Sequence, residues 1–165
     1  MGTRSLTHFK RDSIDSPTLM TMYRQYDGNP SGHGTDMVDF LSEKEVYNGY
    51  PLHAFHDFNG MGDVAAQTVA HLKTWHYPLT EAEALDGSFF TTENRMVNPR
   101  YGEPRIGNVY IVEPDSTDQG EEYVYTVYLD DAEKQIFIKV EDAYQNTVLF
   151  QGSVYDASRN DLFER

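Results

Sequence analysis

The chain has 165 residues, of which 27 are acidic and 13 are basic, and a formal net charge of −14. This length suits one hydrophobic core, and 39% apolar residues are enough to fold it, so we expect a single domain over residues 1–165 and exclude a disordered chain. The absence of cysteine excludes disulfides, iron–sulfur clusters, cysteine-ligated zinc and a cysteine nucleophile.

The acidity is concentrated near the C-terminus. Residues 106–165 carry 13 acidic and 4 basic side chains, whereas residues 1–60 carry 8 and 5. Such a surface repels nucleic acids and anionic membranes, so we expect no direct contact with either. It could attract a basic protein, and the alternative is a solvated acidic face of a soluble protein. No apolar run approaches the roughly 20 residues of a membrane span, and the start lacks a signal-peptide pattern. We therefore expect a soluble, cytoplasmic protein.

The first elements are two strands and a glycine-rich turn. Residues 5–10 and 18–26 have strand chemistry and are predicted to pair as a hairpin across the polar turn 11–17. The turn that follows reads Tyr26-Asp27-Gly28-Asn29-Pro30-Ser31-Gly32-His33-Gly34. Thr35 is expected to cap a helix that runs to about residue 45, with Met37, Val38, Phe40 and Leu41 on its apolar side.

A second glycine turn, Asn59-Gly60-Met61-Gly62-Asp63, precedes the most regular helical pattern. The predicted apolar face of this helix is formed by Val64, Ala65, Thr68, Val69, Leu72 and Trp75, and Pro78 ends it. Residues 79–105 are a long connection with one short helical turn over 80–85, and strands are predicted at 109–112, 123–129, 135–140 and 147–154. The predicted fold is α+β: an antiparallel sheet of about five to six strands with two main helices packed on one face.

The N-terminal motifs carry a family resemblance. Gly2-Thr3-Arg4-Ser5 and the first glycine turn resemble a widespread family of small uncharacterised proteins from bacteria, phages and fungi. The family pattern is Gly-Thr-Arg near the start, then Asp-Gly-Tyr-Pro-Ser and a glycine before a helix; Asn29 stands where Tyr is more usual. The second turn also resembles the closer members. The resemblance covers residues 1–75 and implies no particular activity.

Both glycine turns lead into predicted helices, whose first backbone N–H groups and positive dipole end can hold phosphate or carboxylate. Neither turn is a Walker A loop or a dinucleotide fingerprint, so no cofactor is expected. If the turns share one hollow, Arg4 and Arg24 could reach a bound anion there. The candidate ligand-binding residues are Arg4, Arg24, Asp27, Gly28, Ser31, Gly32, His33, Gly34, Asn59, Gly60 and Gly62. The alternative is that these glycines serve turn geometry and the arginines pair with nearby acids.

Other groups that could carry chemistry have weaker patterns. His53, His56 and Asp57 lie in an irregular stretch, and His71 and His76 do not share a helix face, so no metal site is predicted. His71 is expected to be a half-buried packing residue. The sequence selects no catalytic residues, although a hydrolase could use Asp27, His33 or His56 as acid or base. Tyr123, Tyr125 and Tyr128 are interpreted as packing residues, because acids flank them where a nucleic-acid platform needs cations.

The sequence thus favours a non-enzymatic binding protein with an anion or small-ligand site at the glycine turns. Two alternatives stay open. One is an acidic interaction protein that binds a basic partner, as phage counter-defence proteins do, and the other is a hydrolase of a phosphorylated or amide substrate. The sequence leaves the oligomeric state open.

Overall fold

The computed structural model describes residues 2–42, 44–47, 57–74 and 108–165. Its elements, in chain order, are β1 (Ser5–Lys10), β2 (Thr18–Arg24), η1 (Pro30–Gly34), α1 (Thr35–Leu41), β3 (Val46–Tyr47), β4 (Phe58–Asn59), α2 (Gly60–Lys73), β5 (Val109–Val112), β6 (Tyr123–Asp130), β7 (Gln135–Asp142), β8 (Thr147–Ser153), α4 (Val154–Ala157) and η2 (Asp161–Phe163). The predicted strands and the second helix are confirmed, with ends that differ by a few residues.

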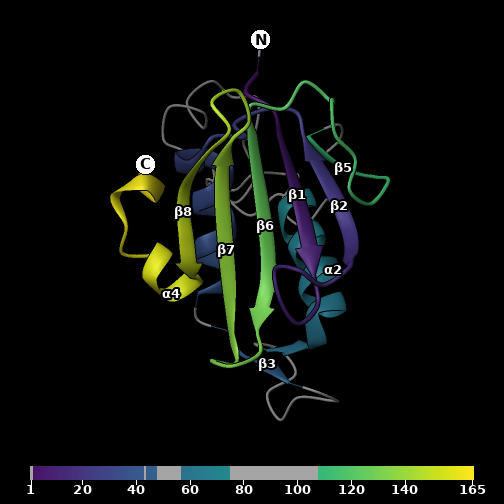
Figure 1. The fold of residues 1–165 in the computed structure, drawn as a ribbon, viewed down its shortest axis with the longest axis vertical. Helices are drawn as coiled ribbons and strands as arrows, with labels where there is room; N and C mark the ends of the chain where they lie inside the picture. The colour runs from purple at the N-terminus through teal and green to yellow at the C-terminus, as the bar shows by residue number, and fades with distance from the viewer. Residues whose placement is uncertain (1, 43, 48–56, 75–107) are drawn as a thin grey trace, which may run out of the picture.

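Six strands form one sheet in the order β5-β2-β1-β6-β7-β8. Neighbouring strands are antiparallel except β1 and β6, which run parallel. The helices α1 and α2 lie behind this sheet in Figure 1, and the described residues place no helix over its other face, here called the helix-free face. The α+β prediction is therefore confirmed. The short strands β3 and β4 form a separate parallel pair beside the start of α2.

The first helix begins earlier than the sequence predicts. Asn29 has the extended backbone of a cap position. The π-helical turn η1 follows it and continues without a break into α1. Pro30 fits the start of a helix because its ring presets φ and its missing N–H would have no partner there. The expectation that Thr35 caps the helix is wrong: its hydroxyl donates to the carbonyls of Pro30 and Phe163 instead. The helix ends at Leu41, short of residue 45.

The core lies between the sheet and the two helices. Alternate residues of β6 and β7 face the helices, and α2 buries most of its predicted apolar face against them. The buried core includes Phe9, Met22, Val64, Leu72, Tyr125, Val127, Ile138 and Val140. Tyr125 and Tyr128 are buried, which confirms that the strand tyrosines are packing residues.

The C-terminal tail, for which no element was predicted, folds back onto the core. After α4 the chain turns through η2, and the Phe163 ring meets the Phe150 ring edge-on at 5.3 Å between centroids. Phe163 also packs against the first glycine turn at Gly34. The predictions for 75–107, including Trp75, His76 and the short helical turn at 80–85, lie outside the described residues, as do those for His53 and His56.

Candidate functional site

The first glycine turn is packed closely against the start of β1, β6 and the C-terminal tail. The Gly28 amide donates to the Thr3 carbonyl at 2.9 Å, and a Cβ on Gly28 would lie 2.8 Å from the backbone of Arg4. A Cβ on Gly34 would lie 2.9 Å from the Phe163 ring. The Tyr125 hydroxyl donates to the Gly28 carbonyl at 2.7 Å. These glycines are needed because neighbouring protein atoms occupy the space of a side chain.

His33 and Arg24 form a buried polar network beneath this turn. Arg24 Nη1 lies 3.2 Å from His33 Nδ1 and 2.8 Å from Asp36 Oδ2, and Arg24 Nε donates to the Tyr26 carbonyl at 2.7 Å. Because a guanidinium can only donate, His33 Nδ1 must accept, and the ring proton must sit on Nε2, 2.7 Å from Thr7 Oγ1. Arg24 is therefore engaged by the protein and faces no free ligand space.

The remaining candidates around the first turn also have structural partners. Asp27 has a positive φ of 55°, and its carbonyl accepts from the His33 amide at 2.7 Å. A Cβ on Gly32 would lie 2.5 Å from the same carbonyl oxygen. The Ser31 hydroxyl accepts from Asn29 at 2.7 Å. The turn is thus organised by its own hydrogen bonds.

Arg4 lies on the opposite face of the sheet from Arg24. Ser5 pairs with Arg24, and successive residues of a strand face opposite sides. Arg4 therefore lies on the helix-free face. Its guanidinium packs against Gly120, where an added Cβ would lie only 2.6 Å from Arg4 Nη1. Its Nε is buried without a hydrogen-bond partner among the described residues. The structure does not bring the two arginines together.

The electrostatics of His33 do not favour a hydrolase. The ring has no exposed surface, and burial, together with the charge of Arg24, holds the pKa of His33 well below its ordinary value. A general base must reach a substrate proton, and this ring is enclosed by Thr7, Arg24 and an edge-on contact with Tyr125 at 4.9 Å. The geometry therefore supports a structural role for His33.

The second glycine turn lies at the other end of β1. The first turn bonds to the chain just before β1, whereas Asn59, Gly60 and Gly62 line a hollow together with Arg11 and Asp12, which follow β1. In Figure 1 the start of β1 is at the end of the sheet near the N-terminus, and the end of β1 is near β3. The two turns therefore do not share the common hollow that the sequence suggested.

This hollow, here called the α2 groove, has a volume of about 690 Å³. That size is typical of a small-molecule site. Val46, Met61 and Leu129 supply the apolar part of its lining, and the other lining residues are polar, charged or glycine. The lining residues are Arg11, Asp12, Val46, Tyr47, Asn59, Gly60, Met61, Gly62, Leu129, Asp131 and Lys134.

The two glycines of this turn differ in what requires them. Gly60 has a φ of +74°, which a side chain would strain. Gly62 is inside α2, has no such φ, and would place a Cβ with no atom within 4 Å. Neither backbone conformation nor packing therefore requires a glycine at position 62, and the space beside it belongs to the groove.

The start of α2 is only partly capped by the protein itself. The Asp63 carboxylate accepts from the Asn59 amide at 2.8 Å and from Gln67 at 2.9 Å. The next amides, those of Gly60 and Gly62, have no acceptor among the described residues, as expected for the first turn of a helix. They lie on the groove and can donate to a ligand.

Two cations and two acids surround these amides. Lys134 pairs with Asp131 at 2.7 Å, but both side chains are about 70% exposed, so the pair is weak. Arg11 is exposed and forms no ion pair within the part of the chain that the structure describes. Arg11 can therefore bind an anion in the groove, and Lys134 can leave its weak pair with Asp131 to do the same.

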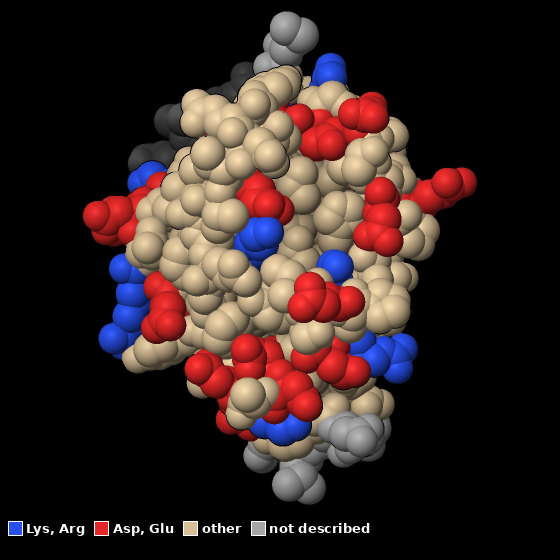
Figure 2. Space-filling model, in the orientation of Figure 1, with Lys and Arg blue, Asp and Glu red and all other residues tan. Residues whose placement is uncertain are grey.

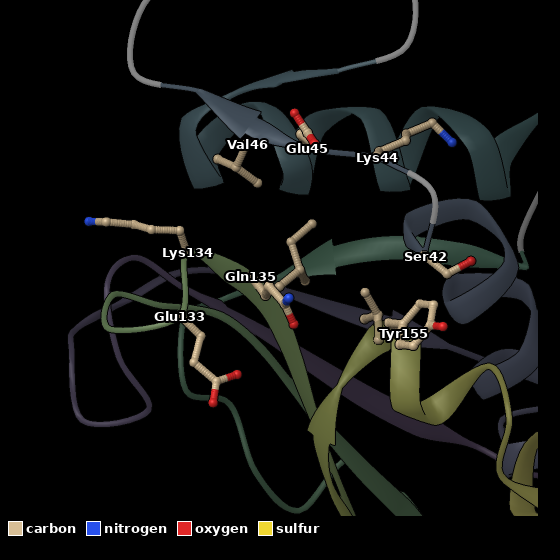
Figure 3. Close-up of a pocket in the computed structure, with 10 residues that line it drawn as sticks. Ser42, Lys44, Glu45, Val46, Glu133, Lys134, Gln135 and Tyr155 are labelled. Atoms are coloured by element: carbon tan, nitrogen blue, oxygen red, sulfur yellow. The ribbon is translucent and has the colours of Figure 1, made fainter.

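A second hollow of about 550 Å³ adjoins the α2 groove and shares Val46 and Lys134 with it. Figure 3 shows its lining: the segment with Lys44 and Glu45 lies across from Glu133 and Gln135, and Tyr155 closes one side. Together the two hollows run between the start of α2 and the turn from β6 to β7. This leaves room for a ligand larger than a single phosphate.

The sequence did not single out Arg11 or Lys134, because both stand in turns without a recognisable motif. Only the pairing of β1 with β6 brings the residues that follow these two strands to one end of the sheet. Within residues 2–42, 44–47, 57–74 and 108–165, no cluster of His, Asp and Glu could hold a metal ion, and no helix is long and apolar enough to cross a membrane. His71 is half-buried and stacks on Phe40 at 4.2 Å, as predicted.

Comparison with known proteins adds no assignment. No family model, no curated protein and no solved structure matches this chain. The resemblance of the N-terminal motifs to a family therefore stays a prediction.

Proposed function

We propose that this protein is a non-enzymatic binding protein that holds a small anionic ligand in the α2 groove. The observation that carries this proposal is Gly62. A glycine within a helix costs about 0.5–1 kcal/mol relative to alanine, and here neither φ nor packing requires it. Close approach of a ligand to the backbone gives a reason for the missing side chain.

The chemistry of the groove favours a phosphate or carboxylate group. The amides of Gly60 and Gly62 lie at the positive end of the α2 dipole, and Arg11 adds a charge that no ion pair neutralises among the described residues. The apolar residues Val46 and Met61 would contact the uncharged part of the ligand.

The test is calorimetric titration with inorganic phosphate, nucleotides and cyclic nucleotides. We expect at least one of these anions to bind the wild type, and Arg11→Ala to weaken binding about tenfold or more, since a charged hydrogen bond is lost. Lys139→Ala is the matched control: Lys139 is a cation of β7 that pairs with Glu141 on the helix-free face, and its loss should leave binding unchanged.

Gly62→Ala separates a binding role from a structural one. Because a Cβ here meets open space, we expect the free protein to be stabilised by about 0.5–1 kcal/mol in chemical denaturation. The same methyl group should weaken anion binding. An unstable Gly62→Ala protein, or one that binds as tightly as the wild type, would contradict the role proposed for this glycine.

A second candidate function is contact with a basic partner. Among the 13 acids of residues 106–165, the described ion pairs involve only Asp131 and Glu141. Figure 2 shows acidic side chains spread over the helix-free face, with a dense patch near the lower end of the sheet. This end carries Asp130, the last residue of β6, and the turn to β7, which includes Asp131 and Glu133.

This second candidate predicts salt-sensitive capture. Immobilised protein should retain a basic partner at about 50 mM salt and release it at about 500 mM, because salt screens exposed charges. Neutralising the patch with Asp130→Asn, Asp131→Asn and Glu133→Gln should reduce retention more than neutralising Asp156 and Glu164, which lie after β8. Retention that does not change with salt, or that falls equally with both sets of substitutions, would count against this function.

A further inference from the structure

The two edge strands of the sheet differ in length and surroundings. The edges are β5, with 4 residues, and β8, with 7. An exposed edge presents unpaired backbone groups to other strands, and proteins protect it with bulges or covering segments and, most directly, with charges or proline. β8 reads Thr-Val-Leu-Phe-Gln-Gly-Ser and contains neither. Its outer edge forms no backbone hydrogen bond with the rest of the described chain.

Exposed hydrophobic side chains collect along this edge. Val148 is 53% exposed and Leu149 is 40% exposed, and Tyr144 and Tyr155 stand exposed just before and just after the strand. Leu149 is the extra residue of a bulge, because Val148 pairs with Glu141 and Phe150 with Val140. The bulge leaves two successive apolar side chains open to solvent. Figure 1 shows β8 at the margin of the sheet.

The charge pattern of this edge indicates its partner. Residues 143–155 contain no charged side chain, although the surrounding third of the chain carries 13 acids. A basic partner would need acids on the strand that it pairs with, and β8 offers none. Two copies of this chain, in contrast, both carry a net negative charge, so acidic side chains on the paired strands would repel each other, and a neutral strand avoids that repulsion. An uncharged strand in an acidic protein fits that arrangement.

We propose that β8 is a self-association surface, on which a second copy of this chain pairs its own β8 in antiparallel orientation and extends the sheet. A twofold interface uses the same patch on both copies, as this neutral run allows. The apolar side chains of Val148 and Leu149 become buried on pairing, and the tyrosines at the strand ends contribute contact area. The surface meets the second hollow at Tyr155 but shares no residue with the α2 groove, and the proposal does not depend on the anion site.

Salt separates this inference from the acidic-partner candidate. Each copy carries a net charge of −14, so two copies repel each other at low ionic strength. The Debye length falls from about 14 Å at 50 mM to about 6 Å at 300 mM salt, and screening of the repulsion should strengthen dimerisation. Binding to a basic partner must weaken under the same change.

The test is sedimentation velocity on the full chain from about 1 μM to about 500 μM, at about 50 and 300 mM salt. We expect a monomer–dimer equilibrium that shifts toward the dimer with concentration and with salt. Val148→Lys and, separately, Leu149→Lys should raise the dissociation constant about tenfold or more, because each would bury a charged ammonium group in the apolar contact between the two strands. Both side chains are exposed, so the monomer should keep its melting temperature.

Ile111→Lys is the matched control, because Ile111 is 62% exposed on the other edge strand and its substitution adds the same charge. It should leave the dimer unaffected beyond the small effect of one charge. A chain that stays monomeric over the whole range overturns the proposal. So does a dimer that persists in both β8 variants, a dimer lost in Ile111→Lys, or a dimer that weakens as salt rises.

Discussion

At the scale of the residue, His33 shows how a motif that suggests a site can instead serve the fold. The ring donates from Nε2 to Thr7 and accepts at Nδ1 from Arg24, which in turn holds Asp36. A buried polar network of this kind is stable only when each member has a partner. Here the glycine turn, the histidine and the arginine that suggested ligand binding instead supply hydrogen-bond partners within the fold.

The buried state of His33 predicts a pH dependence of stability. Burial and Arg24 lower the pKa of His33 in the folded protein, and burial also lowers the pKa of His8. Below the ordinary histidine pKa the unfolded chain therefore binds more protons than the folded one. Stability is greatest above that value, and we expect it to fall as the pH drops from about 7.5 to 5.5, by at most about 1.4 kcal/mol per histidine and pH unit.

Urea denaturation across this pH range is the measurement, with His33→Gln as the comparison. The amide of glutamine offers a donor and an acceptor but does not titrate. The variant is expected to be less stable overall and to lose part of the pH slope. An unchanged slope would show that His33 is not the titrating group.

At the scale of the element, the sequence was informative where the pattern is local. Alternating aromatic and β-branched residues located β5 to β8, and the 3.6-residue spacing of Val64, Thr68 and Leu72 located α2. Local pattern carries no information on which distant strands pair. The parallel contact of Thr7 with Tyr125 could therefore not be predicted, nor could the return of Phe163 onto the first turn.

The C-terminal tail is expected to act as part of the core. Phe163 is buried between Gly34 and the Phe150 ring, and its carbonyl accepts from Thr35. We expect Phe163→Ala to lower the free energy of unfolding by about 3–5 kcal/mol, the usual cost of removing a buried phenylalanine.

Chemical denaturation of Phe163→Ala beside Tyr155→Ala checks this expectation. Tyr155 is half-exposed and stacks under Arg159, so its removal should cost less than about 1 kcal/mol. Equal losses in the two variants would mean that the tail does not stabilise the turn.

At the scale of the whole molecule, the sheet decides which candidate residues can cooperate. β1 runs from the first glycine turn to the α2 groove, so its length separates the two turns that the sequence placed in one site. The sequence could identify the second turn from its glycines, but not its neighbours. Arg11 and Lys134 join it only because β1 and β6 pair in parallel and end together.

The most direct measurement is an NMR titration of the ¹⁵N-labelled protein with inorganic phosphate and with AMP. The account predicts amide shifts at Gly60 and Gly62 and in the residues around Arg11 and Lys134, while the amides of residues 26–34 stay unmoved. Shifts centred on residues 26–34, or none up to about 10 mM of either probe, would contradict the assignment of the α2 groove as the binding site.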